Sequence, residues 1–188
     1  MFDTTHQYGL AKKEHYDTFL KSYGPYRFFV TLPFQRRITV EQGSEKASIY
    51  WRRTTKKLHG NRAVTSIHGC AVMERASIKP DGTGYKNPHF HFLIKDHPIF
   101  STDDDIAVQQ LTDASWKAAR NLKSWNGKAL VSTGDKGIDV KLVYSGDVTH
   151  YLSEDAWQYG WKREERLFFL DKKGLAHLEP SAAGEIFW

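Results

Sequence analysis

The chain has 188 residues, of which 40% are hydrophobic and 14% aromatic, and these proportions suit one folded domain rather than two. A net charge of +5, from 27 basic and 22 acidic residues, permits an anionic partner without requiring one. The single cysteine, Cys70, excludes an intrachain disulfide and a cysteine-rich zinc site.

The N-terminal sequence lacks the apolar core of a signal peptide, and no apolar run approaches the roughly 20 residues that cross a bilayer. We therefore expect a cytoplasmic protein without a membrane partner. Residues 1–188 are treated as one domain, whose first 25 residues form a polar lead-in with some helix.

Residues 26–34, YRFFVTLPF, are apolar on both faces and predict a central strand that ends at Pro33. Residues 44–60 predict a helix with Ser44 as its N-cap and Gly60 just past its end. Its apolar positions recur at steps of three and four residues and predict the face that contacts the sheet: Ala47, Tyr50, Trp51, Thr54 and Leu58.

The opposite side of this helix carries four cations, Arg52, Arg53, Lys56 and Lys57. They favour either a solvated face near the helix C-terminus or a surface that contacts nucleic-acid phosphates.

Residues 63–78 and 88–96 predict an antiparallel hairpin across a Pro-Asp-Gly turn. A second helix is expected from 102 to 125. Its acidic start, Asp103, Asp104 and Asp105, is typical of helix capping rather than of a metal site.

Residues 128–133 and 137–144 predict a second hairpin, followed by a third helix from about residue 146 and by a C-terminal strand and tail at 164–188. This order indicates an α+β fold of ferredoxin-like or RRM-like type. We expect an antiparallel sheet of about five strands with helices packed on one face.

Two histidines, His89 and His91, lie one residue apart in the strand HFHFLI. Side chains alternate along a strand, so both imidazoles point to one face while Phe90, Phe92 and Ile94 point to the other. The pair suits a metal, although two hydrated surface histidines would give the same pattern.

If the hairpin turns about Asp81 and Gly82, Glu74 lies opposite His89 and joins the two imidazoles on one face. The alternative is a carboxylate at the sheet edge that pairs with Arg75 or a lysine. Two histidines, a carboxylate and open positions for water suit Mn²⁺ or Mg²⁺, and would also accept Co²⁺, Ni²⁺ or Zn²⁺.

The order of these motifs resembles the HUH endonucleases, which include rolling-circle replication initiators, relaxases and related transposases. His89, Phe90 and His91 match the His-hydrophobic-His motif of the family, and Glu74 matches its third metal ligand. The strand that contains Thr31 and Leu32 is similar to the first family motif, so the resemblance covers roughly residues 26–160.

The resemblance implies metal-dependent nicking and joining of single-stranded DNA through a 5′-phosphotyrosine. Tyr151, on the third helix, falls where the family places its nucleophile. Tyr144 and Tyr159 are the other candidates, and an ordinary packed aromatic is the alternative for Tyr151.

The chain departs from the family where a lysine normally follows the tyrosine. His150 and Glu154 occupy the two lysine positions of the doubled motif, and Asp147 occupies its first tyrosine position. His150 or Glu154 could instead accept the phenolic proton.

Two functions follow from these patterns. The first is a replication initiator of a plasmid or phage that acts on single-stranded DNA or an origin hairpin. Because no Walker-type loop is present, its DNA would be unwound by a host helicase. The second is a non-catalytic HUH-fold module that binds nucleic acid through the basic helix or through Phe28, Phe29 and Phe90.

Overall fold

The protein is described by a computed structural model. It describes residues 17–36, 38–74, 77–78, 85–86, 88–123, 127–131, 137–144, 148–149, 152 and 167–177. Among these residues, no helix has both the length and the apolar character needed to cross a membrane.

The main sheet has six strands, and every neighbouring pair is antiparallel. In spatial order they are β6 (Asp139–Leu142), β1 (Phe28–Pro33), β5 (His89–Ile94), β2 (Gly69–Glu74), β7 (Leu167–Asp171) and β8 (Gly174–His177). Two short strands, β3 (Ser77–Ile78) and β4 (Tyr85–Lys86), form a separate pair. The α+β class is confirmed, and the sheet is compatible with a ferredoxin-like arrangement.

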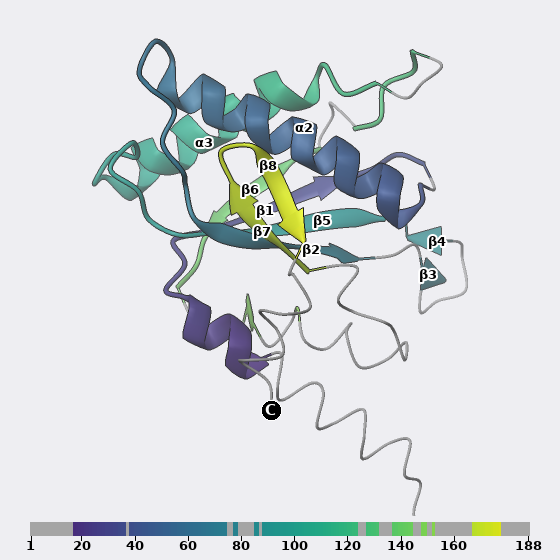
Figure 1. Ribbon diagram of the computed structural model, residues 1–188, viewed down its shortest axis with the longest axis horizontal. Helices are drawn as coiled ribbons and strands as arrows, with labels where there is room; N and C mark the ends of the chain where they lie inside the picture. The colour runs from purple at the N-terminus through teal and green to yellow at the C-terminus, as the bar shows by residue number, and fades with distance from the viewer. Residues whose placement is uncertain are drawn as a thin grey trace, which may run out of the picture.

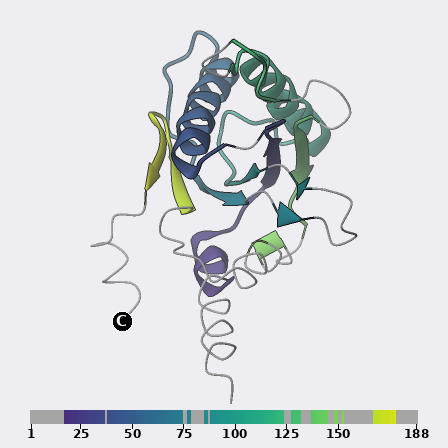
Figure 2. The same ribbon diagram turned by 90° about the vertical axis from the view of Figure 1, so that its right-hand side faces the viewer.

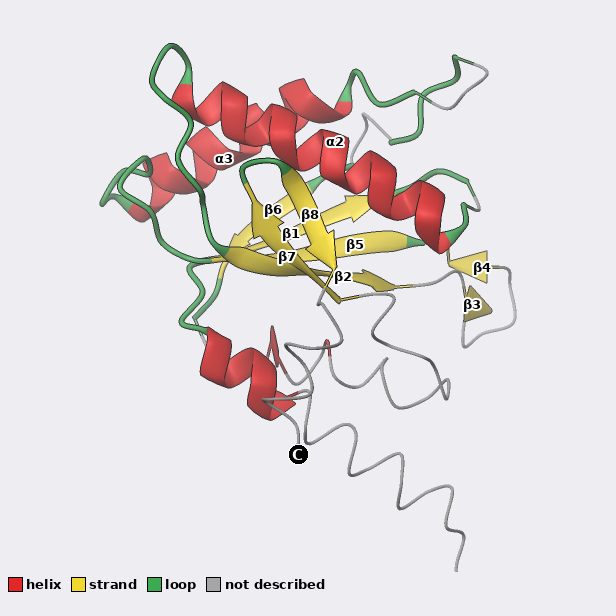
Figure 3. Cartoon of the chain, in the orientation of Figure 1, coloured by secondary structure: helices red, strands yellow, loops and turns green. Residues whose placement is uncertain are grey.

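Helices α2 (Val40–His59) and α3 (Asp104–Ala119) cover one face of the sheet, whereas helical residues 17–23 lie beneath the other face (Figure 1). Figure 2 shows these layers edge-on, and Figure 3 separates the helices from the strands by colour. The expectation that the helices cover only one face is therefore wrong.

Each face of the sheet has its own apolar core. The α2–α3 side contains the larger cluster, which includes Phe28, Phe90 and Phe92 from the strands and Trp51 from α2. The opposite side contains a smaller cluster: Phe19, Leu20, Cys70, Leu93, Leu152 and Leu167. β2 and β5 are therefore buried on both faces along most of their length, whereas β1 is buried toward α2 and α3 and half-buried on its other face.

Helix α2 begins five residues earlier than the sequence predicts. Thr39, rather than Ser44, is its N-cap, and the Thr39 hydroxyl accepts the amide hydrogen of Gln42 at 3.2 Å. The Gln42 side chain accepts the Thr39 amide in return, which completes a capping box. Gly60 is the C-cap as predicted.

Helix α3 confirms that its acidic start is used for capping. The Asp103 carboxylate accepts the Ile106 amide hydrogen at 3.0 Å. Asp104 accepts hydrogen bonds from Arg27, which also donates to the backbone oxygen of Ser101 at 2.7 Å. Arg27, the residue that precedes β1, thus ties the start of that strand to the start of α3.

The C-terminal part of the sheet differs from the prediction in two ways. β7 and β8 form a hairpin where only one strand was expected. β6 pairs with β1. Leu130 and Val131 instead contact the residues just after β1. Val131 forms an isolated bridge with Phe34, and the Leu130 backbone oxygen accepts the Gln35 amide hydrogen. The predicted pairing of 128–133 with 137–144 is absent from the described residues, which include neither 132–133 nor the intervening turn.

A chain of hydrogen bonds links the end of α2 to the segment after β5. His59 donates from Nδ1 to the Thr55 oxygen, and its Nε2 accepts the Thr65 amide hydrogen at 3.2 Å. The Thr65 hydroxyl lies 3.0 Å from His59 Nε2 and 3.1 Å from His97 Nε2. His97 Nδ1 accepts the Ile99 amide hydrogen at 3.1 Å. These contacts fix the end of the sheet at which β2 begins.

Gly69, the first residue of β2, lies where two strands approach closely. A Cβ atom at this position would lie 2.1 Å from the Leu93 backbone oxygen and 2.9 Å from Leu170 Cδ1. Neither neighbour can move without disturbing the paired strands, so glycine is needed here.

We predict that Gly69→Ala lowers the free energy of unfolding by about 3 kcal/mol, the upper end of the usual range for overpacking. Gly60→Ala is the control: its Cβ would meet open space, but its φ of 57° is left-handed, so we expect a loss of about 1 kcal/mol. Urea denaturation of both variants measures the difference. A Gly69→Ala protein as stable as the parent would contradict the close strand approach.

Candidate metal centre

The predicted strand register is the one observed. Glu74, the last residue of β2, is the direct partner of His89, the first residue of β5. Val72 is the partner of His91, so Glu74, His89 and His91 project from the same face of the sheet. This is the face of the smaller core, opposite α2 and α3.

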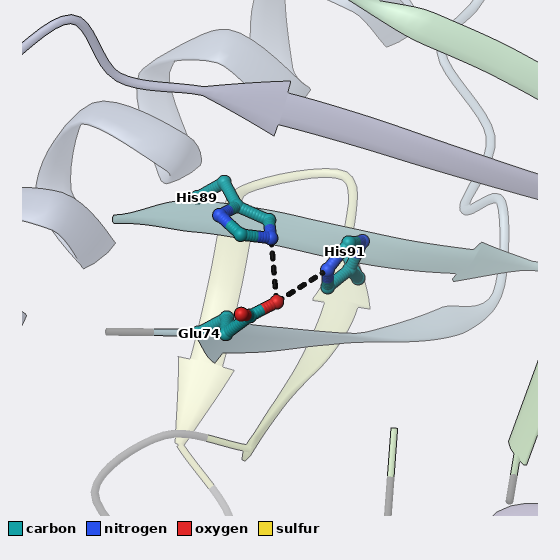
Figure 4. Close-up of side chains that lie close together, drawn as sticks. All are labelled: Glu74, His89 and His91. Atoms are coloured by element: carbon teal, nitrogen blue, oxygen red, sulfur yellow. Dashed lines mark hydrogen bonds and ion pairs between the residues drawn. The ribbon is translucent and has the colours of Figure 1, made fainter. Parts of the chain in front are cut away.

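The three side chains converge on one point (Figure 4). Glu74 Oε2 lies 2.5 Å from His89 Nε2 and 3.1 Å from His91 Nε2, and the two imidazole rings are 4.6 Å apart. One ligand atom from each residue lies within 4.8 Å of the others. Among the described residues, this is the one group of at least three histidine, cysteine or acidic side chains that could hold a metal.

The site is largely closed to solvent. Glu74 retains 8% of its exposure, and the side chains of His91 and His89 retain 4% and 14%. Burial alone would raise the pKa of Glu74, but hydrogen bonds and charge from His89 and His91 outweigh it and hold that pKa well below its usual range. Glu74 is therefore ionised and available as a ligand at neutral pH.

The alternative of an edge carboxylate does not fit the sheet. β2 lies between β5 and β7, so Glu74 is at the end of an internal strand rather than on an edge strand. Its partners include both histidines. Arg75, the other partner considered, lies outside the described residues.

His91 is further held by two residues of β1. Thr31, its direct strand partner, has its hydroxyl oxygen 3.2 Å from His91 Nδ1. The Phe29 ring stacks on the imidazole at 4.9 Å, with 16° between the planes. The sequence pattern gave no signal for either contact, because β1 and β5 are about 60 residues apart and their register had not been predicted.

The donor set fits a divalent metal. Two ligands bound at right angles about 2.1 Å from an ion lie about 3 Å apart. The Glu74 oxygen lies 3.1 Å from His91 Nε2, which matches this spacing, and 2.5 Å from His89 Nε2, a separation that would lengthen when an ion binds. Imidazole nitrogen and carboxylate oxygen together suit borderline divalent cations. The group could thus hold a metal ion.

The catalytic residues expected from sequence, Tyr151, His150 and Glu154, lie outside the described residues, as does Tyr159. Residues on either side of Tyr151 are described. Val148 and Leu152 pack in the smaller core, on the sheet face that carries the three ligands.

Tyr144 is 86% exposed and follows β6. β6 and β5 both pair with β1, with Leu142 and Ile94 opposite Phe28. Tyr144 therefore lies near the Ile94 end of the sheet, away from His89.

The four cations of α2 lie far from the ligand group. They belong to the helix layer on the opposite face of the sheet, and all four are exposed. The N-terminal part of α2 contacts Met73, beside Glu74, whereas the cations lie in its C-terminal half. Arg53 donates to the Asn121 backbone oxygen at 2.9 Å, so this cation also links α2 to the end of α3.

No protein-family model, curated protein or solved structure matches this chain.

We predict that His89→Ala and His91→Ala each weaken Mn²⁺ binding by about 100-fold or more, because partners outside the ligand shell are already worth about 10- to 100-fold. Glu74→Ala should weaken binding less, since water can replace its oxygen. Isothermal titration calorimetry measures the affinities, and circular dichroism checks the fold.

The control is His68→Ala, which removes an exposed imidazole near the other end of β2. A double His89→Ala, His91→Ala protein that binds Mn²⁺ as tightly as the parent would contradict the assignment.

Proposed function

We propose that this protein nicks and rejoins single-stranded DNA in a metal-dependent reaction of the HUH type, through a covalent 5′-phosphotyrosine. The observation that carries the proposal is the convergence of Glu74 with His89 and His91 on one sheet face. The proposed biological role is initiation of rolling-circle replication of a plasmid or phage, with a host helicase as partner.

Glu74, His89 and His91 would hold Mn²⁺ or Mg²⁺. When bound, such an ion neutralises charge on the scissile phosphate. The strands fix the three ligands before substrate arrives, because β2 and β5 are both internal to the sheet. The low pKa of Glu74 keeps its carboxylate ionised at neutral pH, so no other group has to remove its proton before the ion binds.

Tyr151 is the proposed nucleophile. Its phenolic oxygen forms the bond to phosphorus, and the bond from phosphorus to the 3′ oxygen breaks. The 3′ oxygen leaves with the bonding electrons and takes a proton from water, which gives a free 3′-hydroxyl. The phenol is protonated at neutral pH, so a base must take its proton, and His150 and Glu154 are the proposed acceptors.

Contacts of the neighbouring residues support this assignment. Leu152 is buried in the smaller core, and the Thr149 hydroxyl donates to Asp17 at 2.8 Å. Asp17 also pairs with Lys21 at 2.5 Å within the helical residues 17–23. Thr149 and Leu152, which flank Tyr151 in the sequence, thus contact elements on the side of the sheet that bears the ligands.

The second candidate function is a nucleic-acid-binding module without chemistry. The replacement of the family lysines by His150 and Glu154 favours it. Two of the three sheet aromatics do not: Phe28 and Phe90 are 0% exposed beneath α2 and α3, so neither can stack on a base. The third, Phe29, is half-buried and already stacks on His91. Such a module would rely on the basic side of α2.

We predict that Tyr151→Phe lowers formation of the covalent DNA adduct by on the order of 10³-fold or more, since it removes the attacking oxygen alone. Labelled single-stranded DNA incubated with Mn²⁺ and run on a denaturing gel measures the adduct. Tyr144→Phe is the control and should form adduct at the parental rate.

Adduct that persists in Tyr151→Phe would exclude this residue as the nucleophile. If the parent protein forms no adduct with Mn²⁺ or Mg²⁺, the binding-module function is supported instead.

A further prediction concerns the basic side of α2. Charge reversal at Arg52, Lys56 and Lys57 should weaken single-stranded DNA binding and reduce its salt dependence, because fewer counterions are released. Adduct formation at saturating DNA should not change, since these residues lie on the other side of the sheet from the ligands. Arg53 is kept because it bonds to Asn121.

The salt dependence is measured by fluorescence anisotropy between 50 and 200 mM salt, roughly the range over which phosphate contacts dominate. Unchanged affinity and slope would identify this side of α2 as merely solvated.

A further inference from the structure

Thr31 occupies a defined position beside one metal-binding histidine. It is the direct partner of His91 in the β1–β5 pairing, and its hydroxyl oxygen lies 3.2 Å from His91 Nδ1. The other ring nitrogen, Nε2, faces Glu74 at 3.1 Å. The two nitrogens of His91 therefore face two different partners, one on β1 and one on β2.

An ionised carboxylate can only accept, so without a cation Nε2 donates its hydrogen to Glu74 and Nδ1 of a neutral ring accepts from Thr31. A cation bound at Nε2 reverses the direction of the hydrogen bond to Thr31. A neutral histidine that offers Nε2 to a cation carries its proton on Nδ1, and that N–H needs an acceptor when it is buried. His91 is 4% exposed, so solvent is a poor substitute. The Thr31 hydroxyl can accept this hydrogen bond, because a hydroxyl oxygen has two lone pairs.

We propose that Thr31 is a positioning residue for the metal centre, which accepts the Nδ1 hydrogen of His91 and so presents Nε2 to the ion. This inference rests on the metal-binding part of the proposed function and does not depend on DNA cleavage.

Phe29 supplements this role. It lies two residues before Thr31, so both side chains project from the same face of β1. Its ring stacks on the imidazole with 16° between planes and limits tilting of the ring, whereas Thr31 hydrogen-bonds to Nδ1. β1 thus supplies two separate constraints on a single ligand.

The strand itself cannot shift to relieve a change at Thr31. β1 is paired along its length with β5 and over four residues with β6. Its other face is anchored by Val30 and Leu32, which are 1% and 0% exposed in the larger core. Loss of the hydroxyl should therefore act on His91 rather than on the position of the strand.

Thr31→Val tests the proposal, because it replaces the hydroxyl by a methyl group of similar size. We expect the Kd for Mn²⁺ alone to rise by about 10-fold or more, the usual effect of removing a partner outside the ligand shell. Thr31→Ser keeps the hydroxyl and should restore affinity to within about threefold. Thr31→Ala provides a second hydroxyl-free variant in case the valine methyl disturbs packing.

A spectroscopic measurement separates positioning from general structure. In the Zn²⁺-loaded parent, ¹⁵N-labelled His91 should show a protonated, slowly exchanging Nδ1. That resonance should be lost or exchange rapidly in Thr31→Val and return in Thr31→Ser, while the His89 resonances stay unchanged.

Three results would overturn the inference: parental Mn²⁺ affinity in both hydroxyl-free variants, equal loss in Thr31→Ser and Thr31→Val, or a parent protein that binds no Mn²⁺. The last would also remove the proposed function. A parent that binds Mn²⁺ in a Thr31-dependent way but forms no DNA adduct would support this inference and contradict the nuclease.

Discussion

The register between β2 and β5 is the constraint on which the candidate site depends. It places Glu74 opposite His89, and a slip of one residue would send the carboxylate into the core beneath α2. The apolar residues that alternate with the ligands prevent such a slip, because Met73 and Phe90 are each buried on the opposite face. The packing of one side of the sheet thereby determines the chemistry on the other.

The two faces of the sheet are specialised differently. The α2–α3 side carries most of the large buried aromatic side chains and forms the larger apolar core. The other side has an apolar cluster near residues 19–20 and the polar ligand group at the His89 end of β5. The polar group is tolerated because Glu74, His89 and His91 satisfy one another by hydrogen bonds and charge.

Local patterns in the sequence were sufficient to predict the three residues of the ligand group. Period-two alternation in HFHFLI and one turn signal placed three ligands together, because the hairpin that carries them is formed by neighbouring segments. Pairings across long separations were not predictable in this way. The β6–β1 pairing and the contacts of Thr31 with His91 depend on how the whole sheet assembles.

Smaller errors also have physical causes. Gly43 has a low helix propensity and Ser44 is a good N-cap, so the sequence favours a late start for α2. The helix nevertheless runs through Gly43, which packs closely on β2: a Cβ there would lie 2.8 Å from Met73 Cε. The β7–β8 hairpin was missed because its short second strand, GLAH, has weak alternation.

The imidazoles of His59 and His97 have a single arrangement of hydrogens that satisfies all the partners described above. His59 must donate from Nδ1 and His97 from Nε2, because their other nitrogens accept backbone amides. The His97 ring is therefore neutral in the folded protein. Burial, with nearby His59 and His68, holds the pKa of His97 below its usual 6.5 despite Asp96.

In the unfolded chain, His97 would bind a proton at a pH where His97 of the folded protein does not. The contribution of this residue to the free energy of unfolding is therefore full above about pH 6.5 and declines as the pH falls. Acid should accordingly loosen first the end of the sheet that lies away from the ligands.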